Sequence, residues 1–398
     1  MEKKYNRARW ACYTANICMS AVIIMPPLLF STFRELYNIS YSLLGTLVLV
    51  NFLTQLTVDL IFTFFSHKFN IKKTVKSIPI ISMIGFMIYI VLPLAIPKYA
   101  YMGLVLGTII FSASSGFAEV LVSPVIAAIP SENPEKEMSK LHAMYAWGVV
   151  GVTILGTLIM SIVPMEKWYI LVVSMMIIPI GCTMLFLNAE IPDITVEKAG
   201  SNVLGLFKNK HMIFCFFLIF VGGASENVIS QWSSNYIEQS LNMPKIVGDI
   251  VGVALFAVML GVGRSLYASK GGNIRRTMLI GSIGATICYA VLIFVDIPVA
   301  GMIACALSGY FVAMLWPGSL ILVQDKIPNG GVAMFALMAA GGDLGSALAP
   351  QLVGYVADMS TTIGNVDGLK LGMLVAIIFP VISIGLLTVG IKLKDSKK

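Results

Sequence analysis

Four acidic residues stand well inside long apolar stretches of this 398-residue chain: Asp59, Glu119, Glu226 and Asp343. A charged carboxylate at the centre of a membrane helix costs about 2.5–3.5 kcal/mol, so four would cost on the order of 10 kcal/mol. No lysine lies mid-stretch and Arg264 stands near the end of one, so ion pairs cannot neutralise all four acids. The acids must therefore take up protons or hold a cation. Groups that exchange protons as their solvation changes are what proton-coupled transport requires.

The positions of the four acids predict different roles for them. Glu119 and Glu226 lie mid-stretch and are predicted to carry protons, with Asp343 as a third proton-coupling candidate. The alternative for each is a structural hydrogen bond, and Asp343 stands among glycines that allow two helices to approach closely. Asp59 lies near the end of its stretch, which favours a gate or a structural role.

Polar side chains at helical spacing predict the lining of a path. Asn51, Gln55 and Asp59 are four residues apart and share one helix face. Such a face cannot contact lipid, so we expect Asn51 and Gln55 to line an aqueous cavity. The stretch 225–235 is denser in polar groups, and its Asn227 and Gln231 are predicted to bind a substrate.

Three tryptophans, Trp147, Trp232 and Trp316, also lie inside the apolar stretches. Flat aromatic faces suit the apolar faces of a sugar ring, so all three are candidate substrate contacts. Tight packing around glycine-rich helix crossings is the alternative for each.

The composition places all these residues in membrane helices. Hydrophobic residues make up 58% of the chain and charged residues 12%, against about 25% charged in soluble domains. A helix needs about 20 apolar residues to cross a bilayer. Twelve such spans are predicted, at 8–32, 42–65, 76–96, 100–128, 140–163, 167–188, 212–238, 246–269, 276–297, 299–325, 332–357 and 367–391. The fold class is therefore an all-α integral membrane protein, with the lipid bilayer as its solvent.

Basic residues set the orientation of these spans. With the N-terminus inside, the inner side holds 22 lysines and arginines and the outer side 5, which accounts for all 27. We therefore expect a multi-pass protein of the cell membrane with both termini in the cytoplasm. Loop or helix-end positions suggest gating roles for a further set, which comprises Asp59, Lys72, Lys73, Arg264, Arg275 and Arg276.

The two halves of the chain repeat each other. Ser115-Gly-Phe117 with Pro124 is echoed by Ser308-Gly-Tyr310 with Pro317 at the same spacing, and the pair Lys72-Lys73 by Arg275-Arg276. These features pair predicted helix n with helix n+6, which is typical of two six-helix halves with a substrate path between them. The predicted divisions are an N-terminal half at 1–195, a central cytoplasmic loop at 196–211 and a C-terminal half at 212–398.

Several of these segments resemble one family. Phe117-Ala-Glu119 with Pro124, Phe220-Val-Gly-Gly223 with Glu226, and Leu315-Trp-Pro317 are similar to helices 4, 7 and 10 of the fucose:proton symporters. The resemblance implies the major facilitator fold and symport of protons with a small polar solute, a sugar being the leading class. It departs where that family has a helix-1 aspartate, here apolar near Val22. It departs again at a helix-5 asparagine, here Tyr145, which is expected at the substrate site.

Two other functions remain open from the sequence. The same buried acids would suit a drug/proton antiporter that exports lipophilic cations, and a non-transporting membrane receptor is a further alternative. No nucleotide loop or nucleophile–base pair is present, which argues against an enzyme. The six cysteines lie in apolar runs without paired spacing, so no metal or cofactor is expected. The expected partners are a sugar-like solute and protons, with no nucleic acid, and the expected working form is a monomer.

Overall fold

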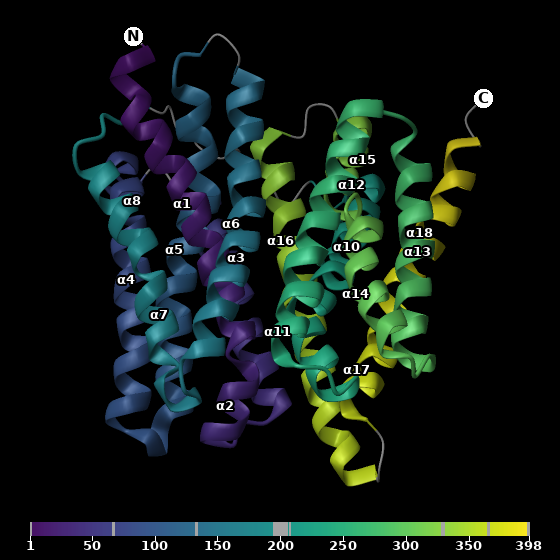
Figure 1. Ribbon diagram of the computed structural model, residues 1–398. Helices are drawn as coiled ribbons and strands as arrows, with labels where there is room; N and C mark the ends of the chain where they lie inside the picture. The colour runs from purple at the N-terminus through teal and green to yellow at the C-terminus, as the bar shows by residue number, and fades with distance from the viewer. Residues whose placement is uncertain are drawn as a thin grey trace. The chain divides into compact units, whose positions relative to one another are not determined.

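A computed structural model describes residues 2–65, 68–131, 134–193, 206, 208–327, 331–363 and 367–395 (Figure 1). Within these ranges every regular element is a helix. Residues 196–205 and 207 of the predicted central loop lie outside the described residues.

The described helices match the predicted spans. Eleven of them are long and apolar enough to cross a membrane. The remaining predicted span, 332–357, falls in the 33-residue helix α16 (Gly331–Ile363), which carries Asp343. The prediction of an all-helical fold built from membrane-length helices is confirmed.

Chain contacts divide the molecule into two compact units. The first unit comprises Met1–Ile39 and Val50–Ala199, and the second comprises Ser40–Leu49 and Gly200–Lys398. One helix, α3 (Tyr41–Phe65), is divided between them, because its first turns belong to the second unit. The other helices of the first unit are α1 (Glu2–Leu28), α2 (Phe30–Tyr37), α4 (Ile71–Ala95), α5 (Ala100–Ala128), α6 (Pro134–Ile162), α7 (Tyr169–Met175) and α8 (Ile177–Leu187).

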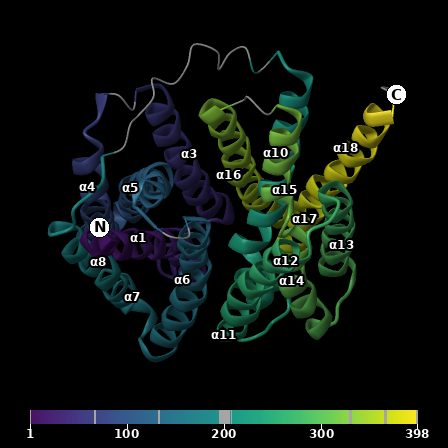
Figure 2. The ribbon, with the colours of Figure 1, turned by 90° about the horizontal axis from the view of Figure 1, so that it is seen from above.

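The second unit is built around α10 (Lys210–Asn235) and α16, which run side by side (Figure 2). Its other described elements are the π-helical segments η4 (Tyr236–Ser240) and η5 (Gly248–Leu255), and the helices α11 (Lys245–Val247), α12 (Phe256–Lys270), α13 (Ile274–Phe294), α14 (Pro298–Val312), α15 (Leu315–Lys326), α17 (Gly368–Ala376) and α18 (Ile378–Asp395).

Glycines allow the helices of each unit to pack closely. A Cβ on Gly85 of α4 would lie 2.4 Å from the backbone nitrogen of Phe111 on α5. A Cβ on Gly345 of α16 would lie 2.0 Å from the carbonyl oxygen of Phe220 on α10. Any larger residue at either position would push the two helices apart, as expected for helix pairs that associate in lipid.

The repeat seen in the sequence has a structural counterpart. α4 and α13 both begin after an asparagine, Asn70 and Asn273, whose side chain accepts a hydrogen bond from the backbone nitrogen three residues later. That nitrogen belongs to Lys73 in one helix and to Arg276 in the other. The basic pairs therefore lie in the first turn of equivalent helices, and each helix begins with the same cap.

A proline, Pro317, interrupts the membrane span that α14 and α15 form. Pro317 has no backbone N–H, so the carbonyl of Ala313, four residues earlier, has no donor within the helix. Ala313 and Met314 lie between the two helices, and the backbone of Met314 leaves regular α-geometry. A free carbonyl is thus left inside the second unit for another side chain to use.

Candidate functional site

In the first unit, α3 and α5 form a seam of polar side chains. Asn51 on α3 accepts hydrogen bonds from Gln55 at 3.1 Å and from Ser112 of α5 at 2.5 Å. Four residues along, a Cβ on Gly116 of α5 would lie 3.2 Å from the Cα of Gln55. Residue numbers increase in the same direction along the two helices, so α3 and α5 run parallel. Asn51 and Gln55 are buried, and these hydrogen bonds hold the two helices together along the seam.

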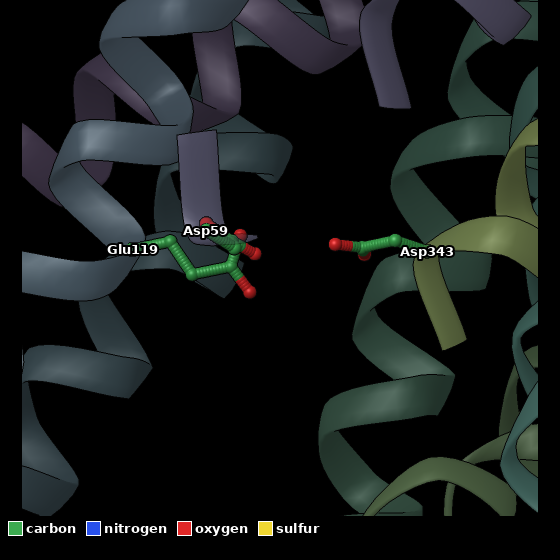
Figure 3. A group of neighbouring side chains, drawn as sticks. All are labelled: Asp59, Glu119 and Asp343. Carbon is green, nitrogen blue, oxygen red and sulfur yellow. The ribbon is translucent and has the colours of Figure 1, made fainter. Parts of the chain in front are cut away.

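The next step along this seam brings two acids together. A carboxylate oxygen of Asp59 on α3 lies within 4.8 Å of one of Glu119 on α5. Figure 3 shows these two side chains close together. The Asp59 residue is 6% exposed. Glu119 makes no hydrogen bond or ion pair in the described part of the chain, and it is exposed.

The chemistry of this pair follows from its charge. Two carboxylates at this distance repel each other, and Asp59 is buried, so the pair is stabilised by one shared proton or by a cation held between them. A proton that binds there would belong to the pair rather than to either residue. The sequence assigned Asp59 to a gate or a structural role, whereas the structure places it beside Glu119.

In the second unit, Glu226 of α10 lies against Arg264 of α12. One terminal nitrogen of Arg264, Nη2, lies 3.4 and 3.2 Å from the two carboxylate oxygens of Glu226. The Arg264 Nε donates to the carbonyl oxygen of Ala313 at 3.1 Å, which is the carbonyl that Pro317 leaves without a donor. One of the four predicted acids is thus neutralised by an ion pair.

The polar residues beside this ion pair hold α10 and α16 together. Asn227 donates to the Ser346 hydroxyl at 2.8 Å and to the carbonyl of Gly223 at 3.2 Å. One turn further on, Gln231 is 2% exposed and its Nε2 has no hydrogen-bond partner in the described part of the chain. Gln231 therefore has a free donor, while the amide nitrogen of Asn227 is already used.

Asp343 lies on α16 and is 4% exposed. A Cβ on its neighbour Gly342 would lie 2.3 Å from the ring of Trp316, so the glycines predicted to permit close approach do so here. Figure 3 labels Asp343 on its own helix. Asp343 belongs to the second unit, whereas the Asp59–Glu119 pair belongs to the first.

The aromatic candidates have different surroundings. Trp232 is fully buried, donates from its indole to the carbonyl of Pro350 at 3.0 Å and contacts the ring of Tyr41 at 5.8 Å. These contacts give Trp232 a packing role. Trp147 on α6 is 67% exposed. Near it, the backbone carbonyl of Tyr145 accepts a hydrogen bond from Ser20 at 2.8 Å.

The basic residues that were predicted to have gating roles make different contacts in the structure. Lys72 forms an ion pair with Asp193 at 2.7 Å, and this interaction holds the pKa of Asp193 below its usual value. Lys73 and Arg276 contribute backbone nitrogens to the two asparagine caps. The Nε of Arg275 is buried and makes no hydrogen bond within the described residues.

Sequence reasoning missed a fifth buried acid. Asp249 in η5 is 2% exposed, lies 3.3 Å from Lys245 and accepts a short hydrogen bond from Ser234 of α10. It lies inside the predicted span 246–269. Its spacing of four residues from Lys245, which puts both on one helix face, was the signal that could have identified the pair.

Comparison with known proteins agrees with this architecture. A family model described as Major Facilitator Superfamily matches residues 11–350. Among solved structures, the chain is similar to a D-xylose-proton symporter, at 14% identity and a TM-score of 0.78, with 96% of each chain covered.

Two further solved structures show the same fold. The nucleoside transporter NupG is 12% identical, with a TM-score of 0.67 and coverage of 96% of this chain and 97% of that one. A variant of the E. coli fucose:proton symporter FucP is 12% identical, with a TM-score of 0.63 and coverage of 96% and 99%. A search of curated proteins finds no significant match. The resemblance to fucose:proton symporters is thus confirmed at the level of the fold.

Proposed function

Because the chain belongs to the Major Facilitator Superfamily, and is therefore a multi-pass membrane transporter rather than an enzyme, we propose that it is a proton-coupled symporter of a small polar solute. A sugar-like solute is the leading class. The proposal includes alternating access, a place in the cell membrane and both termini in the cytoplasm. Both the major facilitator family and the distribution of basic residues support it.

The Asp59–Glu119 pair is the observation that carries the proton-coupling proposal. A proton bound by two neighbouring carboxylates cancels the repulsion between them, so its affinity changes sharply when water reaches the pair or leaves it. Glu119 is the more accessible member, and among the described residues it has no ion pair or hydrogen bond to replace the proton. A transporter that alternates the exposure of this pair would therefore bind a proton on one side and release it on the other.

A polar solute is supported by the second unit. The buried Nε2 of Gln231 has no hydrogen-bond partner among the residues that the structure describes, and the hydroxyl groups of a sugar are acceptors that would satisfy it. The similar solved structures are described as transporters of D-xylose, fucose and nucleosides, all solutes that carry several hydroxyl groups. These identities are too low to assign a solute, so the hydroxylated class alone is proposed.

The ion pair of Glu226 and Arg264 argues against a lipophilic-cation site at Glu226. Such a cation needs an acid with unbalanced charge, whereas Glu226 already faces a guanidinium at 3.2 Å. A cation would also meet the partly exposed positive charge of Arg264, which raises its binding free energy.

Uptake into proteoliposomes tests this function. Purified protein should accumulate D-xylose, L-fucose or uridine when the outside is made acidic, and the Glu119→Gln variant should lose this accumulation yet keep counterflow exchange. The neutral amide imitates the protonated acid, so only the proton-linked step is lost. Glu166→Gln, in the segment Met165–Lys167, is the matched control and should behave as the unaltered protein. Normal pH-driven accumulation by Glu119→Gln would contradict the proposal.

A further inference from the structure

The side chain of Arg264 is 41% exposed although it lies within the candidate membrane span Lys245–Tyr267. A guanidinium is costly in hydrocarbon, and charged groups in such spans face the bundle interior or an aqueous cavity. Arg264, three residues before the end of this span, therefore faces water. Its partner Glu226 is less accessible, with its side chain 16% exposed, so the accessible face of the ion pair is the positive one.

The helix packing fixes this guanidinium in place. A Cβ on Gly263 would lie 2.6 Å from the Cβ of Ala313, so only a glycine allows α12 to approach the break after α14 this closely. The approach lets the Arg264 Nε reach the carbonyl of Ala313 at 3.1 Å. That carbonyl is free because Pro317 has no N–H to donate. Three features of the chain thus hold the arginine in a single position.

The ion pair with Glu226 leaves part of the guanidinium unused. A two-pronged arginine–carboxylate pair uses two nitrogens at about 2.7–2.9 Å. Here both carboxylate oxygens lie 3.2–3.4 Å from one nitrogen, Nη2, and Nη1 has no acceptor in the described part of the chain. The guanidinium of Arg264 is therefore able to bind a second carboxylate or to exchange the first for a better placed one.

We propose that Arg264 binds the carboxylate of an anionic solute, and that Glu226 occupies the guanidinium only while no solute is bound. The inference rests on the proposed function and narrows its solute class to sugar acids, which carry one carboxylate and several hydroxyl groups. The hydroxyl groups are those for which the proposed function assigns the Nε2 of Gln231, which lies five residues beyond Glu226 and about 140° round α10 from it. A neutral sugar has no group that would displace Glu226 from Arg264.

The exchange also accounts for a proton. Before the solute binds, the positive charge of Arg264 and the negative charge of Glu226 cancel. When the solute carboxylate pairs with Arg264, Glu226 loses its counter-charge in apolar surroundings and is stabilised by taking up one proton from water. The occupied site then holds one positive guanidinium, one solute carboxylate and one neutral carboxyl group. One anion and one proton therefore enter together, and the only covalent change is the O–H bond that Glu226 gains and a hydronium ion loses.

Matched ligands test this inference by thermal unfolding of the purified full-length protein, because a ligand of the folded state raises the unfolding temperature. D-galacturonate, D-glucuronate and D-gluconate are compared with D-galactose, D-glucose and D-glucitol, which lack the carboxylate. We expect at least one acid to stabilise the protein at a concentration where its neutral partner does not. Stabilisation by none of the acids, or equally by the neutral partners, would overturn the inference.

Variants then assign the effect to the ion pair. Glu226→Gln removes the internal competitor, so the acid should bind about tenfold more tightly. Arg264→Gln alone leaves Glu226 without its counter-charge and is prone to misfold, so the double variant R264Q/E226Q is used and should bind at least about tenfold more weakly than E226Q. Lys270→Gln, which removes a charge from the same helix, is the control. Equal affinity of the double variant and E226Q would remove Arg264 from the site.

Proton uptake separates this inference from the proposed function. Adding the stabilising acid to weakly buffered protein should raise the pH reported by an indicator dye, and E226Q should lose that rise. If the rise persists in E226Q, Glu226 does not take the proton and the exchange is wrong. The proposed function is tested independently, because pH-driven uptake of neutral sugars that depends on Glu119 would sustain it even if no acid binds Arg264.

Discussion

The carboxylate of Asp358 accepts a hydrogen bond from the backbone nitrogen of Ser42 at 2.6 Å. It also accepts one from Tyr41 at 2.9 Å, so a residue of α16 caps the N-terminus of α3. The first N–H groups of a helix have no partner within it, and a negative charge there also interacts favourably with the helix dipole. The start of α3 is thereby held by the second unit, while residues 50–65 belong to the first.

Removing this cap should loosen the start of α3. Asp358→Ala deletes both acceptors and is expected to cost about 1–2 kcal/mol locally. Hydrogen exchange of the amides at 41–49 should then accelerate about tenfold, since 1.4 kcal/mol corresponds to a factor of ten. Asp367→Ala is the control, because Asp367 caps α17 through Leu369 and Lys370 and should change exchange only there. Unchanged exchange at 41–49 in Asp358→Ala would show that the cap contributes nothing.

A charged cluster in the first unit should make stability depend on pH. The Tyr13 hydroxyl donates to Glu137, and Lys140 and Arg9 lie 2.9 and 3.1 Å from its oxygens. The Tyr13 hydrogen bond, and then the two basic groups, lower the pKa of Glu137 from its usual 4.5. The stabilisation is complete above the unfolded-state pKa and is lost as the pH falls through the lower folded-state value.

Glu137→Gln should therefore destabilise the protein by about 1–2 kcal/mol at pH 7, because hydrogen bonds to a charged acceptor are lost. The difference in unfolding temperature from the unaltered protein should shrink as the pH falls from 5 to about 3. Glu166→Gln should show no such trend. A difference that stays constant over this range would mean that the Glu137 charge is not responsible.

The proposed orientation has a direct test by cysteine labelling. Single cysteines replacing Lys72 and Arg275, in a variant without native cysteines, should react with an impermeant thiol reagent only from the cytoplasmic side. The two positions are equivalent in the capped starts of α4 and α13, so both should give the same answer. Labelling of either one from outside intact cells would reverse the orientation.

Gln231 should matter for any hydroxylated solute. Gln231→Ala removes the free Nε2 donor and is expected to weaken binding by about 1–3 kcal/mol, because a buried hydroxyl group of the solute loses its partner. Calorimetric titration with a ligand that raises the unfolding temperature measures the change. Ser230→Ala, on the adjacent helix face, is the control. Equal affinities in the two variants would remove Gln231 from the site.

The membrane helices and the individual polar residues could be predicted from the sequence, but their pairings could not. Hydropathy alone locates the spans, because each needs about 20 apolar residues. The contact of Asp59 with Glu119 depends on the register of α3 against α5, which Gly116 permits by letting α5 approach Gln55. No local pattern encodes that register.

The contact between Glu226 and Arg264 could not be predicted from the sequence for a different reason. The two residues are 38 positions apart. Their contact requires Gly263 to bring α12 against Ala313 and requires a free carbonyl at that point. Glu226, Arg264 and Pro317 each stood out in the sequence, but the hydrogen bond from Arg264 to the Ala313 carbonyl exists only in the folded unit.

The carbonyl that Pro317 leaves without a donor should couple the evolution of positions 317 and 264. If position 317 mutated to any other residue, its N–H could bond to the Ala313 carbonyl within the helix, and Arg264 would lose one of its two anchors. If Arg264 were lost while Pro317 remained, that carbonyl would lack its Arg264 donor. Selection should therefore remove descendants that change only one of the two, so the proline and the arginine should disappear together among diverging relatives.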